Sequence, residues 1–167
     1  EGISYIQRTV NGKTRMSAAK AFLNPAKKRS NLKVITNAHV TKLTLTGKRV
    51  TGVSYHQEGV FGKKKTLKAL KEVIISGGAI NSPQLLQLSG IGPVPLLQKL
   101  GINVQHELPG VGENLRDHYA TRLTGSVEGV QTINDKAHGI RLVGEVAKYC
   151  SGKQSILELG PTTGFCF

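Results

Sequence analysis

Residues 73–79 place small side chains directly after an apolar run, a pattern that suits a flat or phosphate-bearing ligand. The run Val73-Ile74-Ile75 predicts a strand buried on both faces, as in a parallel sheet. Ser76-Gly77-Gly78-Ala79 follows with almost no side-chain bulk, so the main chain can approach a ligand closely. Open α/β sheets bind their ligands at this carboxyl end of the strands. We therefore predict a ligand-binding edge at these residues.

The other potentially reactive or ligand-binding residues lack the spacing that metal binding, nucleophilic catalysis or dinucleotide binding requires. Cys150 and Cys166 form neither a CxxC pair nor a metal-ligand pattern. Ser17 has no nearby base, and we interpret it as a helix cap. Gly110 and Gly112 begin a GxG pattern, but Leu115 takes the place of the third glycine of a dinucleotide fingerprint. Four histidines show no ligand spacing: His39, His56, His106 and His138. We predict no metal site.

The positive charge of the chain is confined to its first part. The 167 residues carry 23 Lys and Arg against 10 Asp and Glu, a net charge of +13. Residues 1–71 hold 16 of these basic side chains and 2 of the acidic ones. Two hypotheses follow: a solvated lysine-rich face, or a basic nucleic-acid-binding module that uses residues 1–71. With four Phe, four Tyr and no aromatic-basic interleaving, the sequence favours the solvated face, and we expect no nucleic-acid partner.

The elements that must position the binding edge are a small meander and a strand followed by helices. We predict strands at 32–36, 40–45, 50–55 and 65–70, with Leu43, Leu45, Val53 and Tyr55 pointing inward. Before the meander we predict a strand at 3–10 ahead of an Asn11-Gly12 turn, and a helix from Ser17 to Leu23 that Asn24-Pro25 ends. After it we predict a helix at 84–88, capped by Ser82 and closed by Gly90, and a helix at 96–100 that stops at Gly101. The remaining predicted elements are a helix at 137–149 and strands at 102–104 and 119–127. Glycines and prolines interrupt the uncharged run Val73 to Gln98, so we predict no transmembrane segment.

Residues 78–92, which read GAINSPQLLQLSGIG, closely resemble the second signature of the glucose-methanol-choline (GMC) family of FAD-dependent oxidoreductases. The resemblance extends to Arg15 with residues 17–19 and 22–26, to residues 31–34 and to residues 108–118, so it covers nearly the whole chain. Its details are similar to the choline dehydrogenase-like or alcohol dehydrogenase branch.

This resemblance implies an α/β fold, in part α+β, from the middle of a two-domain flavoprotein. Residues 1–118 would form part of the doubly wound FAD-binding domain, with the meander at about 32–70 and a strand-Gly-Gly-helix unit at 73–90. Residues 119–167 would start a substrate domain built on an antiparallel sheet. In the family, the GxGxxG motif precedes this segment and the catalytic histidine follows it. We therefore expect an internal fragment with no catalytic residue and no turnover of its own.

The resemblance also implies FAD as cofactor and a small-molecule alcohol or choline-type substrate, whose CH–OH group gives a hydride to flavin N5 while a histidine takes the proton. Dehydrogenase, oxidase and lyase activities all occur in the family, and the sequence leaves this choice, the electron acceptor, the oligomeric state and targeting open. We favour a bacterial enzyme that is located in the cytoplasm or associated peripherally with the membrane.

Three residues are carried over as cofactor-binding candidates. Val40 matches the valine whose main chain contacts the FAD adenine in this family; the alternative is an ordinary strand valine. Gly78 and Ala79 match small residues packed close to the dinucleotide; the alternative is a structural need for small side chains without contact. Asp117 and His118 match a family pair near the cofactor side, and we interpret His118 as a hydrogen-bonded structural histidine.

Overall fold

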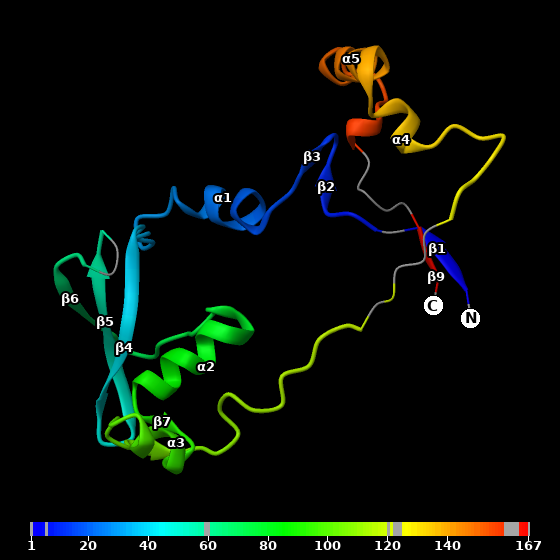
Figure 1. Ribbon diagram of the computed structural model, residues 1–167. Helices are drawn as coiled ribbons and strands as arrows, with labels where there is room; N and C mark the ends of the chain where they lie inside the picture. The colour runs from blue at the N-terminus through cyan, green and yellow to red at the C-terminus, as the bar shows by residue number, and fades with distance from the viewer. Residues whose placement is uncertain are drawn as a thin grey trace. The chain divides into compact units, whose positions relative to one another are not determined.

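The computed structural model describes residues 2–5, 7–58, 61–119, 121, 125–158 and 164–166. The chain divides into two compact units (Figure 1). We call Val34–Thr121 the central unit, and Glu1–Lys33 together with Arg122–Phe167 the terminal unit. Among the described residues, no helix has both the length and the apolar character needed to cross a membrane.

The central unit contains the predicted meander. Its three antiparallel strands lie in the order β4-β5-β6, with bounds β4 Ala38–Thr46, β5 Arg49–Gln57 and β6 Lys64–Lys68. Leu43 and Tyr55 are buried, as predicted, and Leu45 and Val53 are half-buried. The predicted strand at 32–36 is wrong, because these residues form no ladder and Asn37, with φ 53°, interrupts the extended chain just before β4 begins.

A helical layer follows the meander in the same unit. Its elements are α2 Gly78–Leu88, β7 Ile91–Gly92, α3 Val94–Lys99 and β8 His106–Glu107, with β7 parallel to β8. Gly90 and Gly101 end the two helices with φ of 85° and 68°, as the sequence predicts. The strand expected at 102–104 is absent, since the pairing occurs two residues later, at β8.

The start of α2 differs from the prediction. Ser82-Pro83 suggested a first turn, yet the helix begins at Gly78 and contains Pro83 in its interior. Ser82 still acts as a capping side chain, because its Oγ accepts a hydrogen bond from the Gly77 N–H at 3.0 Å. The predicted strand at 73–75 is also wrong: residues 72–76 are irregular and pair with no described strand.

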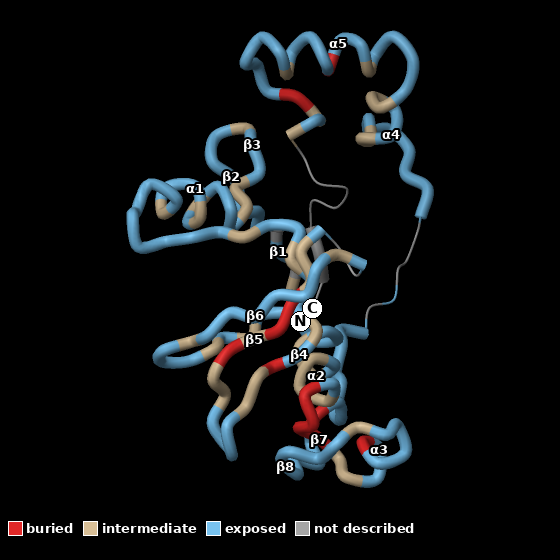
Figure 2. Tube along the Cα trace, turned by 90° about the vertical axis from the view of Figure 1, so that its left-hand side faces the viewer, coloured by how far each residue is buried: buried red, intermediate tan, exposed pale blue. Residues whose placement is uncertain are grey.

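The core of the central unit lies where the meander meets the helices. Its buried apolar side chains are Leu43, Tyr55, Ile91, Leu97 and Val111. Figure 2 shows these buried positions (red) along β4 and β5 and around β7 and α3. Burial of this kind, at about 25 cal/mol per Å² of apolar surface, joins the sheet to the helices.

The terminal unit is built from short elements. These are β1 Ile3–Tyr5, β2 Val10–Asn11, β3 Thr14–Arg15, a π-helix Ala19–Leu23, α1 Asn24–Ala26, α4 Ile133–Lys136, α5 Gly139–Cys150, a 3-10 turn Ile156–Glu158 and β9 Gly164–Cys166. β1 pairs antiparallel with β9, and β2 with β3.

Several predictions for this unit can be compared with its elements. The Asn11-Gly12 turn and the helix at 137–149 are confirmed, and Ser17 Oγ accepts a hydrogen bond from Lys20 N–H at 3.3 Å, as a cap does. The single strand at 3–10 is wrong, since β1 and β2 are separate. Helical backbone continues past Leu23 because Pro25 lies in the first turn of α1, where a missing N–H costs little. Of the strand predicted at 119–127, residues 119, 121 and 125–127 are irregular, and the others lie outside the described residues.

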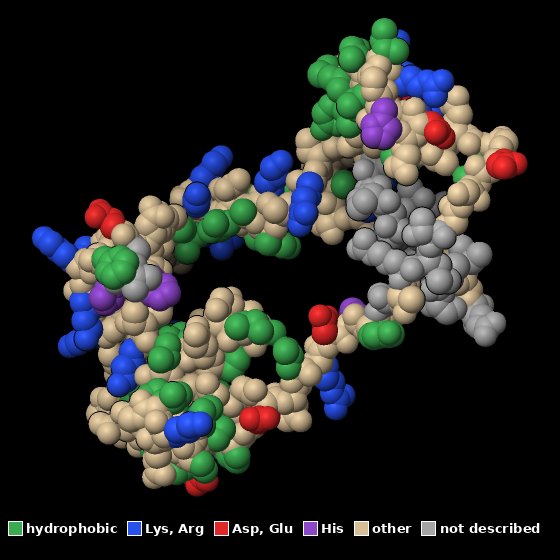
Figure 3. Space-filling view, viewed as in Figure 1, with side chains coloured by type: hydrophobic (Ala, Val, Ile, Leu, Met, Phe, Trp, Pro, Cys, Tyr) green, Lys and Arg blue, Asp and Glu red, His purple; other side chains and the backbone are tan. Residues whose placement is uncertain are grey.

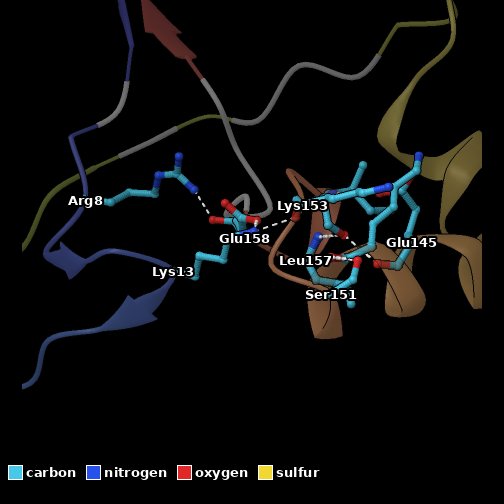
Figure 4. Close-up of polar contacts among 10 residues, drawn as sticks. Arg8, Lys13, Glu145, Ser151, Lys153, Leu157 and Glu158 are labelled. Atoms are coloured by element: carbon cyan, nitrogen blue, oxygen red, sulfur yellow. Dashed lines mark hydrogen bonds and ion pairs between the residues drawn. The ribbon is translucent and has the colours of Figure 1, made fainter.

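Polar contacts join the two ends of the chain within this unit. Lys13 Nζ lies 2.8 Å from Glu158 Oε1 and also donates to the Lys153 carbonyl at 2.5 Å. Arg8 donates to the Glu158 carbonyl, and Figure 4 shows both cations directed at Glu158. The N-terminal arm is therefore fixed to the turn after α5.

Glu145 is a buried carboxylate that fixes this turn to α5. It accepts hydrogen bonds from Lys148 Nζ at 2.7 Å and from Ile156 N–H at 3.0 Å. The ammonium group of Lys148, followed by the Ile156 N–H, lowers the pKa of Glu145 to about 2. The ionised form is thus the one that holds the turn.

Candidate functional site

A groove of about 460 Å³ in the central unit contains the predicted residue Val40, and we call it the β4 groove. It lies between the start of β4, the irregular segment before α2 and one side of α2. Its lining residues are Ala38, His39, Val40, Val53, Val73, Ile74, Ile75, Ser76, Gly77, Asn81, Gln84, Leu85 and Leu88. The lining side chains are mainly apolar, as they commonly are in small-molecule sites.

The register of the meander fixes which way the main chain of Val40 points. Within the described residues β4 pairs only with β5, so its other edge is free. Glu58 N–H donates to the Asn37 carbonyl at 2.7 Å, which makes these two residues a hydrogen-bonded pair. Because such pairs alternate along an antiparallel ladder, the Val40–Tyr55 pair is a non-hydrogen-bonded one. The N–H and C=O of Val40 therefore face the free edge.

Ser89 attaches the end of α2 to this same edge. Its side chain is fully buried, and its Oγ accepts a hydrogen bond from Leu43 N–H at 2.8 Å while donating to the Leu85 carbonyl at 2.6 Å. The contact covers the edge of β4 at Leu43 and leaves the edge uncovered at Val40. Sequence reasoning missed Ser89, although a single hydroxyl between the apolar end of a helix and its closing glycine is a usable signal.

Across the groove, the turn into α2 leaves little room for a side chain at Gly77. A Cβ there would lie 3.2 Å from the Asn81 Cβ and 3.3 Å from the Ser82 nitrogen, closer than most Cβ contacts. Of the small residues predicted as a binding edge, Ser76 and Gly77 line the groove, and Gly77 presents only main chain to it. A flat, partly polar group fits a groove with main chain on both sides.

Gly78 and Ala79 occupy the first turn of α2 and do not line the β4 groove, whereas the preceding Ser76 and Gly77 do. Gly78 has φ 84° and open space where a Cβ would lie. Ala79 lines a second groove of about 680 Å³, on the side of α2 that faces loop 110–113. The structure therefore brings Val40 and Gly77 to one groove and places Ala79 at another.

The arrangement suits binding and offers little acid–base chemistry. Among the residues that line the β4 groove, His39 alone carries an ionisable side chain. Asp117 accepts a hydrogen bond from the His118 backbone N–H at 2.8 Å, and both residues are exposed. The described residues contain no cluster of three or more His, Cys, Asp or Glu that could hold a metal ion.

Comparison with protein families gives a match over most of the chain. A family model described as GMC oxidoreductase matches residues 1–120. An oxygen-dependent choline dehydrogenase from Staphylococcus xylosus is 52% identical over 118 residues, which cover 71% of this chain and 20% of that protein. A protein of the same name from Pseudomonas fluorescens (strain Pf-5) is 53% identical over 119 residues, 71% of this chain and 21% of that protein. The matched part thus spans about a fifth of the length of these relatives.

Solved structures show the same fold. An FAD-dependent oxidoreductase from Chaetomium thermophilum, studied in complex with a small fragment, superposes with a TM-score of 0.84 at 29% identity, over 98% of this chain and 29% of that one. A formate oxidase superposes with a TM-score of 0.78 at 23% identity, over 98% and 28% of the two chains. The predicted mixed helix-and-sheet fold class is confirmed.

Proposed function

This chain belongs to the GMC oxidoreductase family, and we propose that it supplies part of the FAD-binding domain of an enzyme that oxidises the CH–OH group of an alcohol. The observation that carries the proposal is the free edge of β4 at Val40, which faces a groove walled by the small residues before α2. The nucleic-acid alternative gains no support from the comparisons, which match flavoenzymes.

The β4 groove suits the adenine end of FAD. An adenine ring carries an amino donor beside a ring-nitrogen acceptor, and the C=O and N–H of one residue at a strand edge complement that pair. In this proposal the Val40 main chain binds the adenine edge, and the apolar walls at Val53 and Leu85 contact its faces. Because the contact is made by main chain, the valine side chain is needed only for packing.

Gly78 and Ala79 are proposed to keep the start of α2 accessible to the rest of the dinucleotide. Gly78 has a positive φ, which a side chain would strain, and nothing lies where its Cβ would be. A larger side chain at either position would project from the first turn of the helix. Residues 1–118 are proposed as part of the FAD-binding domain, and residues 119–167 as the start of the substrate domain.

FAD, when bound, accepts the hydride of the alcohol. The residues of this chain bind and orient the cofactor, and none of those described is assigned to proton transfer. The relatives named choline dehydrogenases support a choline-type alcohol as substrate. We also propose a cytoplasmic or peripherally membrane-associated location, which fractionation of cells can test.

Main-chain binding at Val40 can be tested with three variants of the full-length protein that contains this segment. Val40→Pro removes the N–H, and we expect FAD to bind about tenfold or more weakly, the result of losing one hydrogen bond to a bound ligand. Val40→Ala keeps the main chain, so its FAD affinity should change little.

Ala38→Pro is the matched control. Ala38 pairs with Gln57 in the same non-hydrogen-bonded series, so its N–H also faces the free edge and its loss breaks no ladder bond. Ala38 also lines the β4 groove, but its N–H is not the one assigned to adenine, so FAD affinity should fall less in Ala38→Pro than in Val40→Pro. Equal FAD affinity of the Val40→Pro and Ala38→Pro proteins, measured by flavin fluorescence titration, would contradict the proposal.

A further inference from the structure

Two histidines lie directly opposite each other on the meander. His39 of β4 pairs with His56 of β5, in the same hydrogen-bonded series as Asn37 and Glu58. Side chains of directly opposed residues project from the same face of a sheet, with Cβ atoms about 4.5–5.5 Å apart. Because side chains alternate along a strand, this face is the one opposite to the side chain of Val40. Figure 3 shows histidine side chains (purple) at the surface of the meander.

The nitrogen atoms of this pair are not all satisfied. His56 Nδ1 is shielded from solvent and has no hydrogen-bond partner among the described residues. His39 is exposed, so its imidazole can turn about its side-chain bonds toward His56. A shielded imidazole nitrogen without a partner calls for a bound group to satisfy it, and in the tautomer with its proton on Nε2 the Nδ1 lone pair can bind a metal ion.

The surroundings leave space for a hydrated ion. A groove of about 630 Å³ borders His39 and is lined by Asn37, Ala38, His39 and Glu58. Asn37 and Glu58, which lie just beyond the paired ends of β4 and β5, line this groove beside His39. Since the described residues hold no cluster of three metal-binding side chains, water would complete the coordination.

We propose that His39 and His56 form a two-imidazole site for a divalent late transition-metal ion, of the class of Ni²⁺, Cu²⁺ and Zn²⁺. Imidazole nitrogen suits these ions, whereas Mg²⁺ and Ca²⁺ prefer oxygen ligands. The bound ion would join β4 to β5 beside the edge that carries Val40. The two imidazoles project from the face opposite to the Val40 side chain, but His39 also lines the β4 groove, so FAD affinity is measured beside metal affinity in the histidine variants.

Lys64 places a positive charge next to this site and opposes cation binding. It pairs with His56 from the β6 side, so its ammonium group lies on the same face and repels a cation. The ammonium group is carried on an exposed, flexible stem and can turn away, so it weakens binding without preventing it. Removing this charge should therefore strengthen metal binding, whereas removing either histidine should weaken it.

The test is calorimetric titration of the full-length protein with NiCl₂. Replacing either histidine, as His39→Gln or His56→Gln, should weaken Ni²⁺ binding about tenfold or more, the factor that corresponds to about 1.4 kcal/mol of lost coordination. The Ni²⁺ affinity of the double variant should lie within twofold of that of each single variant. Losing one histidine already removes the chelate, so losing the second costs little more. Lys64→Gln should tighten binding.

His106→Gln is the control, because His106 is an exposed histidine on β8 with no opposed histidine. It should leave Ni²⁺ affinity unchanged. Unchanged affinity in His39→Gln, or weaker binding in Lys64→Gln, would overturn the proposal. The Lys64 measurement keeps the test decisive if His56→Gln folds poorly, and FAD content measured on the same samples distinguishes failure of this site from failure of the proposed function.

Discussion

Replacing Ser89 by alanine should loosen the attachment of α2 to the edge of β4. The hydroxyl accepts a hydrogen bond from the Leu43 N–H at 2.8 Å, and both residues are almost completely buried. In the Ser89→Ala protein this N–H has no partner and no access to water. The change removes one oxygen atom and leaves the apolar packing of the core in place.

The magnitude follows from the groups that lose their partners. The Leu85 carbonyl, which accepts from the Ser89 hydroxyl, also accepts from the Ser89 backbone N–H at 3.1 Å and stays satisfied. The cost therefore comes from the Leu43 N–H alone, and an unsatisfied buried donor costs about 1–3 kcal/mol. We expect the free energy of unfolding to fall by about that amount.

Urea unfolding and FAD titration of the full-length protein measure the two consequences. FAD affinity should fall together with stability, because Ser89 fixes the edge that carries Val40 only three residues from Leu43. Ser126→Ala, at an exposed position, is the control and should change stability by less than about 0.5 kcal/mol. If Ser89→Ala and Ser126→Ala unfold at the same urea concentration, the reasoning is refuted.

Three further predictions concern other positions. Gly90→Ala should destabilise the central unit by about 2 kcal/mol or more, because Gly90 has φ 85° and its Cβ would lie 2.3 Å from the Asn103 carbonyl oxygen. Thermal unfolding measures this change, and an unchanged Tm would contradict the prediction. Gly144→Ala, at an exposed position inside α5 with open space around it, should instead stabilise by about 0.5–1 kcal/mol in the same assay. The lowered pKa of Glu145, about 2 against an ordinary 4.5, means that its contribution to stability is complete above pH 4.5 and is lost as the pH falls toward 2. Circular dichroism of α5 during acid titration should show this loss, and Glu145→Gln should abolish that part of the pH dependence.

The sequence predicted the meander well, because local turn chemistry sets its register. Thr46-Gly47-Lys48-Arg49 predicts a turn, and Gly47 adopts φ 56° between β4 and β5. The alternation of Leu43, Val53 and Tyr55 then fixed the inward face.

Predictions failed where one local signal has two structural meanings. Ser82-Pro83 fits a helix start, yet Ser82 caps Gly77 from inside α2. Val73-Ile74-Ile75 has the composition of a buried parallel strand, but a strand needs a neighbour, and no described residue pairs with it. Composition carries no information about which segment supplies the partner.

The candidate site was only partly predictable. Val40 was identified by resemblance, but the direction of its N–H and C=O follows from the ladder that begins with Asn37 and Glu58. The role of Ser89 depends on a contact with Leu43, 46 residues away in the chain. Such long-range contacts arise from packing, and no local pattern encodes them.

The flavin content of the purified full-length protein tests the central claim most directly. We expect a yellow protein whose absorption spectrum and released cofactor identify stoichiometric FAD. A colourless protein that also fails to bind added FAD would contradict the assignment of the β4 groove to a flavin cofactor.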